Sequence, residues 1–161
     1  MNAISKLMLG QVSKEQFLEI NAISDVAKTI EKGLLEAYQS QNADSVEEVV
    51  YLTFVFEFFD ERIVDVVNKL LVSDWHYKHE DIIWILQRIS SYKSIEYLYD
   101  AIELRPRYLE WDDNYAFEVK CVRAIYYIGK EKSFSYLEKL CKHSNDTIRE
   151  MAQKQLKKLM Q

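Results

Sequence analysis

The sequence predicts an all-α fold, and three observations support this prediction. Glycine and proline are scarce, with 3 glycines and 1 proline among 161 residues, which disfavours folds that need many hairpins or phosphate-binding loops. Apolar residues recur at helical spacing along most of the chain, as in amphipathic helices. The C-terminal half also repeats its own pattern, and 161 residues fit a single domain with a genuine core.

Residues 1–74 form the less regular part of this expected domain. Two helices should open with serine N-caps at Ser13 and Ser24; their apolar stripes consist of Phe17, Ile20 and Ile23, and of Val26, Ile30, Leu34 and Tyr38. Asp44 or Ser45 should open a third helix that is apolar nearly all round. Its acidic first turn favours a helix over a strand. A fourth helix is expected over "RIVDVVNKLLV".

The C-terminal half contains an internal repeat. The segment "IIWILQRISSYKSIEYLYDAI" aligns with "CVRAIYYIGKEKSFSYLEKL" at an offset of 39 residues, and a partial third copy follows. The matched residues include Ile82 with Cys121, Leu86 with Ile125, and Ser94 with Ser133, and the third copy includes Ile148. Each unit should be a helix, a short turn, a serine cap and a second helix. Such periods predict a right-handed α-solenoid of antiparallel helix pairs, with about eight or nine helices.

The clearest of these units resemble HEAT repeats. The resemblance lies in "FEVKCVRAIYYIGKEKSFSYLEKL" followed by "NDTIREMAQKQLKKL", and it extends over about residues 77–161. Ile128 and Gly129 close the first helix of the unit, and an Asp-x-Ile-Arg opening, Asp146 to Arg149, starts the next. Glu118 departs from the pattern, because many HEAT repeats carry an arginine there. The usual pairing of that arginine between repeats is therefore not expected at this joint.

Charge is distributed unevenly along the chain, whose net charge is −5. Residues 1–119 contain 22 acids against 11 bases, whereas residues 120–161 contain 4 acids against 10 bases. The larger part should attract a basic partner and repel nucleic acid. No apolar run reaches the about 18 residues of a membrane span, and the first residues make a poor secretion signal. A cytoplasmic protein is expected, with Cys121 and Cys141 as reduced thiols in core positions.

A first polar corner is predicted within "SDWHYKHEDI", from Ser73 to Ile82. Histidines three residues apart beside carboxylates could bind zinc, but no third histidine is close, so no metal site is expected. The alternative is a helix corner, in which Asp74 ends one helix and Trp75 and Tyr77 fill the joint. Glu80 and Asp81 would then lie at the favourable N-terminal end of the next helix.

A second corner is predicted within "RPRYLEWDDNYAFE". Pro106 should stop the preceding helix, and Asp112 or Asp113 can cap the helix that begins at Ala116. Equivalent corners of a stacked array lie on one edge, so the two should form one acidic, aromatic ridge. Glu57, Asp60, Glu61 and Asp65 either extend this ridge or are solvated helix ends. The predicted partner-binding residues are Trp75, His76, His79, Glu80, Tyr108, Glu110, Trp111, Asp112, Asp113 and Asn114.

The predicted function is protein binding. Motifs of nucleotide sites, nucleophile elbows and cysteine quartets are absent from the sequence, so neither an enzyme nor a cofactor is expected. "DWHYKHEDI", "YLEWDDNYAFEVKC" and the terminal repeat resemble small bacterial HEAT-like proteins that act as immunity partners of polymorphic toxins. The resemblance implies a cytoplasmic protein that binds and blocks a toxin, a basic nuclease domain in the leading interpretation. The alternatives are a HEAT-like adaptor and, disfavoured by the acidic charge, a helical-repeat DNA glycosylase.

Overall fold

The computed structural model describes residues 2–161, and within that range the regular elements are helices, with no strand. The α-helices are α1 (Ala3–Met8), α2 (Lys14–Ile20), α3 (Val26–Ser40), α4 (Ala43–Val55), α5 (Val64–Leu71), α6 (His79–Ile89), α7 (Ser94–Leu104), α8 (Ala116–Gly129), α9 (Phe134–Leu140) and α10 (Asp146–Leu159). Short 3₁₀ turns are η1 (Glu61–Ile63), η2 (Arg107–Leu109) and η3 (Lys130–Ser133). The all-α prediction is confirmed. Apart from α1, which has 6 residues, nine α-helices agree with the predicted eight or nine.

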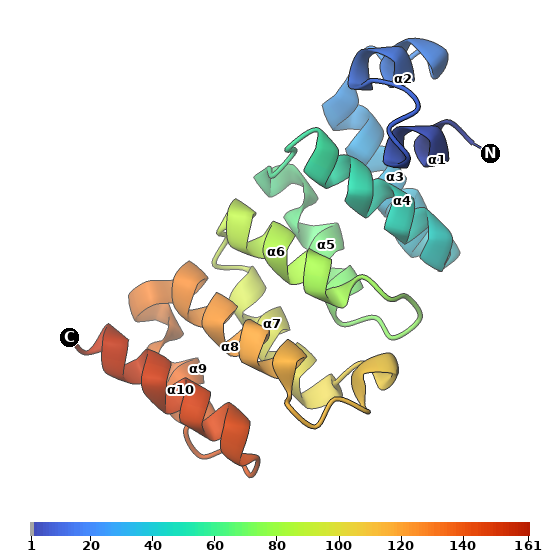
Figure 1. Cartoon of the computed structure of the whole chain (residues 1–161). Coiled ribbons are helices and arrows are strands. Elements are labelled where there is room, and N and C mark those ends of the chain that lie inside the picture. The colour runs from blue at the N-terminus through green and yellow to red at the C-terminus, as the bar shows by residue number, and fades with distance from the viewer. Residues whose placement is uncertain (1) are drawn as a thin grey trace.

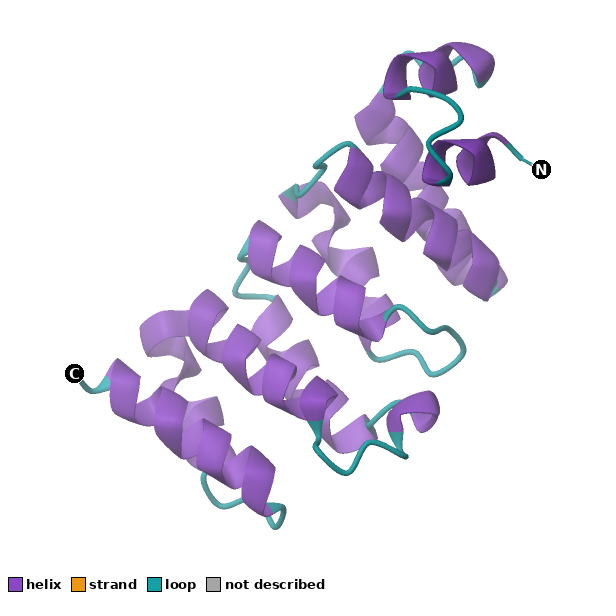
Figure 2. Ribbon diagram, in the orientation of Figure 1, coloured by secondary structure: helices purple, strands orange, loops and turns teal. Residues whose placement is uncertain are grey.

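The helices lie in two layers (Figure 1). Helices α4, α6, α8 and α10 lie side by side in front, and α3, α5, α7 and α9 lie behind them. Each rear helix packs on the front helix that follows it in the chain, and successive helices of a layer also touch. The two termini lie at opposite ends of the array, and short loops join the layers along both edges (Figure 2). Successive loops therefore alternate between the two edges, and every second loop lies on the same edge.

The N-terminal helices begin at Asx or serine side chains, although not always where the sequence suggested. Ser13 caps α2 in a capping box with Gln16, as predicted. Helix α3 is capped by Asp25 rather than Ser24, and α4 by Asn42 rather than Asp44 or Ser45. Each side chain accepts a hydrogen bond from a backbone N–H of the first turn, which would otherwise be unsatisfied. Helix α4 is a helix and not a strand, as its acidic first turn indicated.

The internal repeat corresponds to equivalent helices. The matched residues Ile82 and Cys121 are fully buried in α6 and α8, respectively. The aligned serines are buried too, but neither acts as a cap: α7 has no side-chain cap, and the Ser133 hydroxyl donates to the Lys130 carbonyl. These serines are small residues at a crowded turn. A Cβ at Gly129 would lie 2.8 Å from Ile95 Cδ1, so the end of α8 needs a glycine there.

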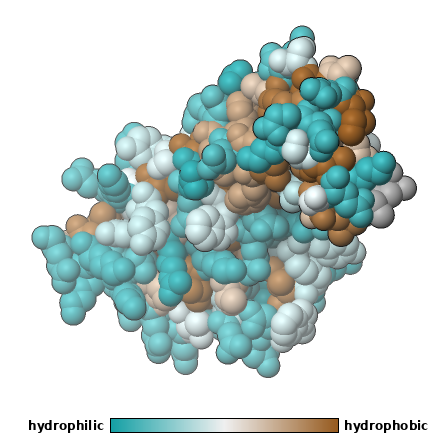
Figure 3. Space-filling model, turned by 45° about the horizontal axis from the view of Figure 1, so that its top comes forward, coloured by the Kyte–Doolittle hydropathy of each residue, from teal (hydrophilic) through white to brown (hydrophobic). Residues whose placement is uncertain are grey.

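A continuous apolar core runs between the two layers along the array. Cys121 is buried in it and unpaired, and burial raises the pKa of its thiol well above the usual range. On the face drawn in Figure 3, hydrophobic residues gather at the N-terminal end, where Met8, Leu9 and Ile20 are exposed, and further exposed apolar residues, such as Leu104 and Met160, lie elsewhere on the molecule. None of the helices described here is both long and apolar enough to cross a membrane.

Candidate partner-binding surface

The first corner, between α5 and α6, is built around two inward-facing histidines. His76 Nε2 donates to the Leu70 carbonyl at 2.8 Å, and its Nδ1 accepts from the Lys78 backbone N–H at 3.1 Å. His79 Nε2 donates to the Ser73 carbonyl. The two rings stack with centroids 4.2 Å apart. The partners of both rings fit neutral imidazoles with the proton on Nε2.

Burial keeps both rings neutral at physiological pH. Desolvation, together with a smaller contribution from the neighbouring His76, lowers the pKa of His79 to about 4. Desolvation also lowers the pKa of His76. His76 and His79 were predicted from the sequence to contact a partner. With 0% and 1% of their surfaces exposed, they cannot do so directly. Their prediction as contact residues is wrong, because both rings are buried and hydrogen-bonded to backbone carbonyls between α5 and α6.

Tyr77 takes the outward position instead. Tyr77 was predicted to fill the joint with Trp75. Instead the Tyr77 side chain is 68% exposed, whereas Trp75 is half-buried against the core. Two stacked imidazoles already occupy the space that Tyr77 was expected to fill.

Among the described residues, no group of three side chains could hold a metal ion, and the two histidines bind backbone carbonyls rather than point at a shared centre.

The second corner, between α7 and α8, is held by Arg105 and Asp112. Helix α7 ends at Leu104, two residues before Pro106, as predicted. The Arg105 guanidinium donates to the carbonyls of Leu109 and Asp112 at 3.2 and 2.6 Å. Its Nε also faces the buried Glu118 carboxylate at 2.9 Å as an ion pair. The loop is therefore tied to the first turn of α8 by one side chain.

Asp112 is the residue that caps α8, rather than its neighbour Asp113. Its Oδ2 accepts from the Ala116 N–H and its Oδ1 from the Asn114 N–H, both at 3.0 Å. These backbone hydrogen bonds lower the pKa of the Asp112 carboxyl, the one from Ala116 most. Because both oxygens are engaged, Asp112 is a structural residue. Asp113 is exposed beside it and makes no ion pair within the described chain.

The two corners meet, as predicted. Tyr108 of the second corner donates its hydroxyl proton to His79 Nδ1 of the first at 3.1 Å. Burial raises the pKa of Tyr108 to about 12, so this donor stays protonated. The rings of Tyr77 and Tyr108 pack edge to face with centroids 5.3 Å apart. Glu80 at the start of α6 also pairs with Lys120 of α8 at 2.8 Å.

The exposed residues of this edge define the corner ridge. The ridge consists of Asp74, Tyr77, Glu110, Trp111, Asp113 and Asn114, all exposed, with Trp111 78% exposed. Trp75, Glu80 and Tyr108 are half-buried behind it, and a groove of about 400 Å³ opens between the corners beside Asp74 and Glu110. Asp74 and Tyr77 were not predicted as partner-binding residues, because their exposure follows from the inward turn of the two histidines, which the sequence does not reveal.

Acids at the opposite edge do not extend the ridge. Glu61 and Asp65 each lie 3.7 Å from Lys93, and Glu61 also accepts from the Ser91 hydroxyl. Arg62 pairs with Asp60 and with Glu31. Asp60, Glu61 and Asp65 are thus matched by bases, whereas Glu57 is exposed and forms no ion pair with any described residue. At the corner ridge, by contrast, Asp74, Glu110 and Asp113 form no ion pair with any described residue, and Arg107 is the exposed base nearby.

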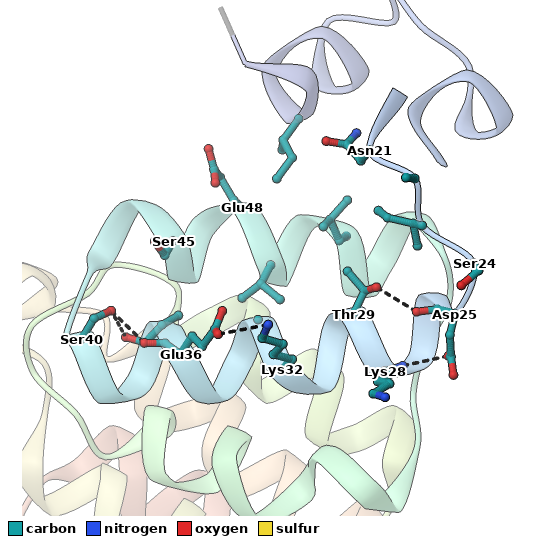
Figure 4. Close-up of a pocket in the computed structure, with 17 residues that line it drawn as sticks. Asn21, Ser24, Asp25, Lys28, Thr29, Lys32, Glu36, Ser40, Ser45 and Glu48 are labelled. Atoms are coloured by element: carbon teal, nitrogen blue, oxygen red, sulfur yellow. Dashed lines mark hydrogen bonds and ion pairs between the residues drawn. The ribbon is translucent and has the colours of Figure 1, made fainter. Parts of the chain in front are cut away.

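A further groove, at the N-terminal end, does not gather side chains that favour one kind of ligand. It has a volume of about 630 Å³ and lies between the α1–α2 segment and helices α3 and α4 (Figure 4). Its polar side chains satisfy one another or the nearby backbone: Asp25 caps α3, Thr29 donates to the Asp25 carbonyl, and Lys32 pairs with Glu36 at 3.6 Å. Positive and negative groups alternate along it, so no ligand charge is favoured.

Comparisons with known proteins provide no identity. Neither the protein-family models, nor the curated proteins, nor the solved structures contain a match to this chain. The candidate site therefore rests on geometry and charge alone.

Proposed function

We propose that this chain is a HEAT-like immunity protein, a right-handed α-solenoid that binds a cytoplasmic toxin and blocks it. The proposed toxin carries a basic surface, as a nuclease domain does where it holds its substrate. One observation carries the proposal: two loops from different helix pairs join through His79 and Tyr108 into a single ridge. The exposed acids of this ridge have no ion-pair partner among the described residues.

The corner ridge combines the two properties that such an interface needs. Trp111 and Tyr77 offer large, rigid side chains that gain contact area at little entropic cost. Asp113, Glu110 and Asp74 offer negative charge that matches a basic surface and speeds encounter with it. The toxin would be blocked by occlusion, because the acids occupy the cationic positions that otherwise bind its substrate.

The buried residues of the corners would act as supports. His79, Tyr108 and Asp112 fix the loop backbones, so the exposed side chains lose little further freedom when a partner binds. Trp75 and Glu80 would contribute through packing and through the pair with Lys120. This division separates residues whose substitution should lower stability from residues whose substitution should lower affinity alone.

Protection of cells from the product of the neighbouring gene tests the proposal. Glu110→Lys with Asp113→Lys reverses two exposed charges of the ridge, and Glu138→Lys on α9 serves as the charge control. We expect the double variant to fold normally, to lose protection and to lose co-purification with the toxin, whereas the control keeps both. Full protection by the well-folded double variant would refute the proposed surface.

The same pair of variants separates the alternatives. A HEAT-like adaptor would lose a non-toxic partner through the same two substitutions, and expression of that partner alone would leave cells viable. Tight binding of duplex DNA at physiological salt, insensitive to the ridge variants, would favour a DNA-repair function instead.

A further inference from the structure

A second surface of different chemistry lies between α6 and α8, in the front layer of Figure 1. It is a groove of about 520 Å³ lined by Ile83, Trp84, Gln87, Lys120, Arg123 and Tyr127. Trp84 is 56% exposed and Tyr127 61% exposed, although each lies on a helix whose other face is packed in the core. Two large aromatic side chains that face solvent across one groove form an exposed apolar patch, and such patches mark interaction sites.

The groove is basic where the corner ridge is acidic. Arg123 is exposed and makes no ion pair or ring contact with any residue from 2 to 161. Lys120 pairs with Glu80, but both side chains are about 40% exposed (40% and 42%), so the pair is weak and a ligand carboxylate can share the ammonium. In the repeat register, exposed Lys154 of α10 stands at the position of Arg123, 31 residues on, and adds a further positive charge.

We propose that this groove binds a short acidic peptide segment of a protein partner, one that carries a bulky apolar side chain between its acids. The apolar side chain would lie between the exposed rings of Trp84 and Tyr127. Its flanking carboxylates would bind Arg123 and Lys120. The side-chain chemistry of the groove, two aromatics with cations beside them, matches such a segment in both respects.

A single-stranded nucleic acid is the competing ligand, because its nucleobases can stack on aromatic side chains and its phosphates can bind lysine and arginine side chains. The surroundings of the groove disfavour it. On the α6 side of the groove, Glu80, which pairs with Lys120, and Asp81 lie at the start of the helix, in a part of the chain (residues 1–119) that contains 22 acids against 11 bases. A continuous polyanion would meet this negative field as it left the groove, whereas a short acidic segment would not.

The test uses a fluorescein-labelled synthetic peptide in which aspartate pairs alternate with leucines. We expect it to bind the full chain saturably in fluorescence anisotropy, and to lose at least about tenfold in affinity with Arg123→Glu and with Trp84→Ala. Tyr92→Ala and Arg107→Glu, exposed residues outside the groove, are the matched controls and should change nothing. Circular dichroism of all four variants checks that each one is folded.

Three outcomes would overturn the proposal. These are the absence of saturable binding, equal binding of a peptide with asparagines in place of the aspartates, and tighter binding of a single-stranded oligothymidylate than of the acidic peptide. The proposal does not depend on the corner ridge, since Glu110→Lys with Asp113→Lys should leave peptide binding intact.

Discussion

The two edges of the helix array contain similar residues but use them differently. At the edge of the α4–α5 and α6–α7 connections, Lys93 lies close to Glu61 and Asp65, so charge is neutralised locally. At the other edge, Arg105 pairs with buried Glu118, Lys120 with Glu80 and Lys78 with Glu47, which leaves exposed Arg107 beside the acids of the corner ridge. The acids left over at that edge face solvent. The two edges have similar compositions, so the acids that remain unpaired depend on which residues the lysine and arginine side chains pair with.

The largest expected effect follows from the buried member of this pairing. Arg105→Ala removes the partner of Glu118, which is 2% exposed, together with two hydrogen bonds to loop carbonyls. We expect a loss of about 4 kcal/mol in the free energy of unfolding, measured by urea denaturation, because one charge is left buried alone. A loss below about 1 kcal/mol would show that Arg105 does not organise the ridge edge.

The next effect is a dependence of stability on pH that arises at the first corner. The pKa of His79 is lowered to about 4 from 6.5, so the unfolded chain binds a proton between these pH values that the folded chain does not. Stability should therefore fall as the pH falls from 6.5 to 4, by about 3 kcal/mol from His79.

His79→Gln isolates this contribution, because the amide can still donate to the Ser73 carbonyl but does not titrate. Urea denaturation at a series of pH values should give a flatter profile for the variant than for the wild type. Carboxylates titrate in both proteins and cancel in the difference. Parallel profiles between pH 6.5 and 4 would contradict the burial of a neutral His79.

A smaller effect separates the two neighbouring aspartates of the second corner. Asp112→Ala removes the acceptor of the Ala116 and Asn114 N–H groups and should lower the melting temperature by about 3 °C. Asp113→Ala should leave the melting temperature unchanged and instead reduce partner affinity. Equal shifts in melting temperature for the two variants would mean that the cap is shared between them.

The smallest effect is expected at the opposite edge. Lys93 is exposed and pairs with Glu61 and Asp65 at 3.7 Å, a geometry that stabilises by less than about 1 kcal/mol. Lys93→Ala should therefore hardly change the urea midpoint, although it uncovers two acids. If that variant gained affinity for the proposed toxin partner, charge alone would define the proposed binding surface, and the shape of the corner ridge would be irrelevant.

The sequence predicted those features that depend on local pattern. The helices, the stop before Pro106, the opening of α10 at Asp146 and the equivalence of Ile82 with Cys121 all follow from periodicity or from backbone preference. The meeting of the two corners followed from the repeat, because equivalent loops of a stacked array share an edge.

The direction of individual loop side chains could not be predicted in this way. Tyr77 and His76 are adjacent and both can be buried, yet in the structure it is His76 that turns inward and donates to the Leu70 carbonyl. Asp112 and Asp113 are chemically identical, and only the positive φ of 54° at Tyr115 aims the Ala116 N–H at one of them. Such choices depend on backbone geometry and on neighbours distant in sequence.

Amide hydrogen exchange of the chain with and without the proposed toxin partner tests the central claim most directly. The account predicts strong new protection at residues 73–77 and 107–114, with no change at residues 57–65 and 90–93. Protection at the opposite edge, or protection at one of the two corners without the other, would contradict a single ridge formed by both.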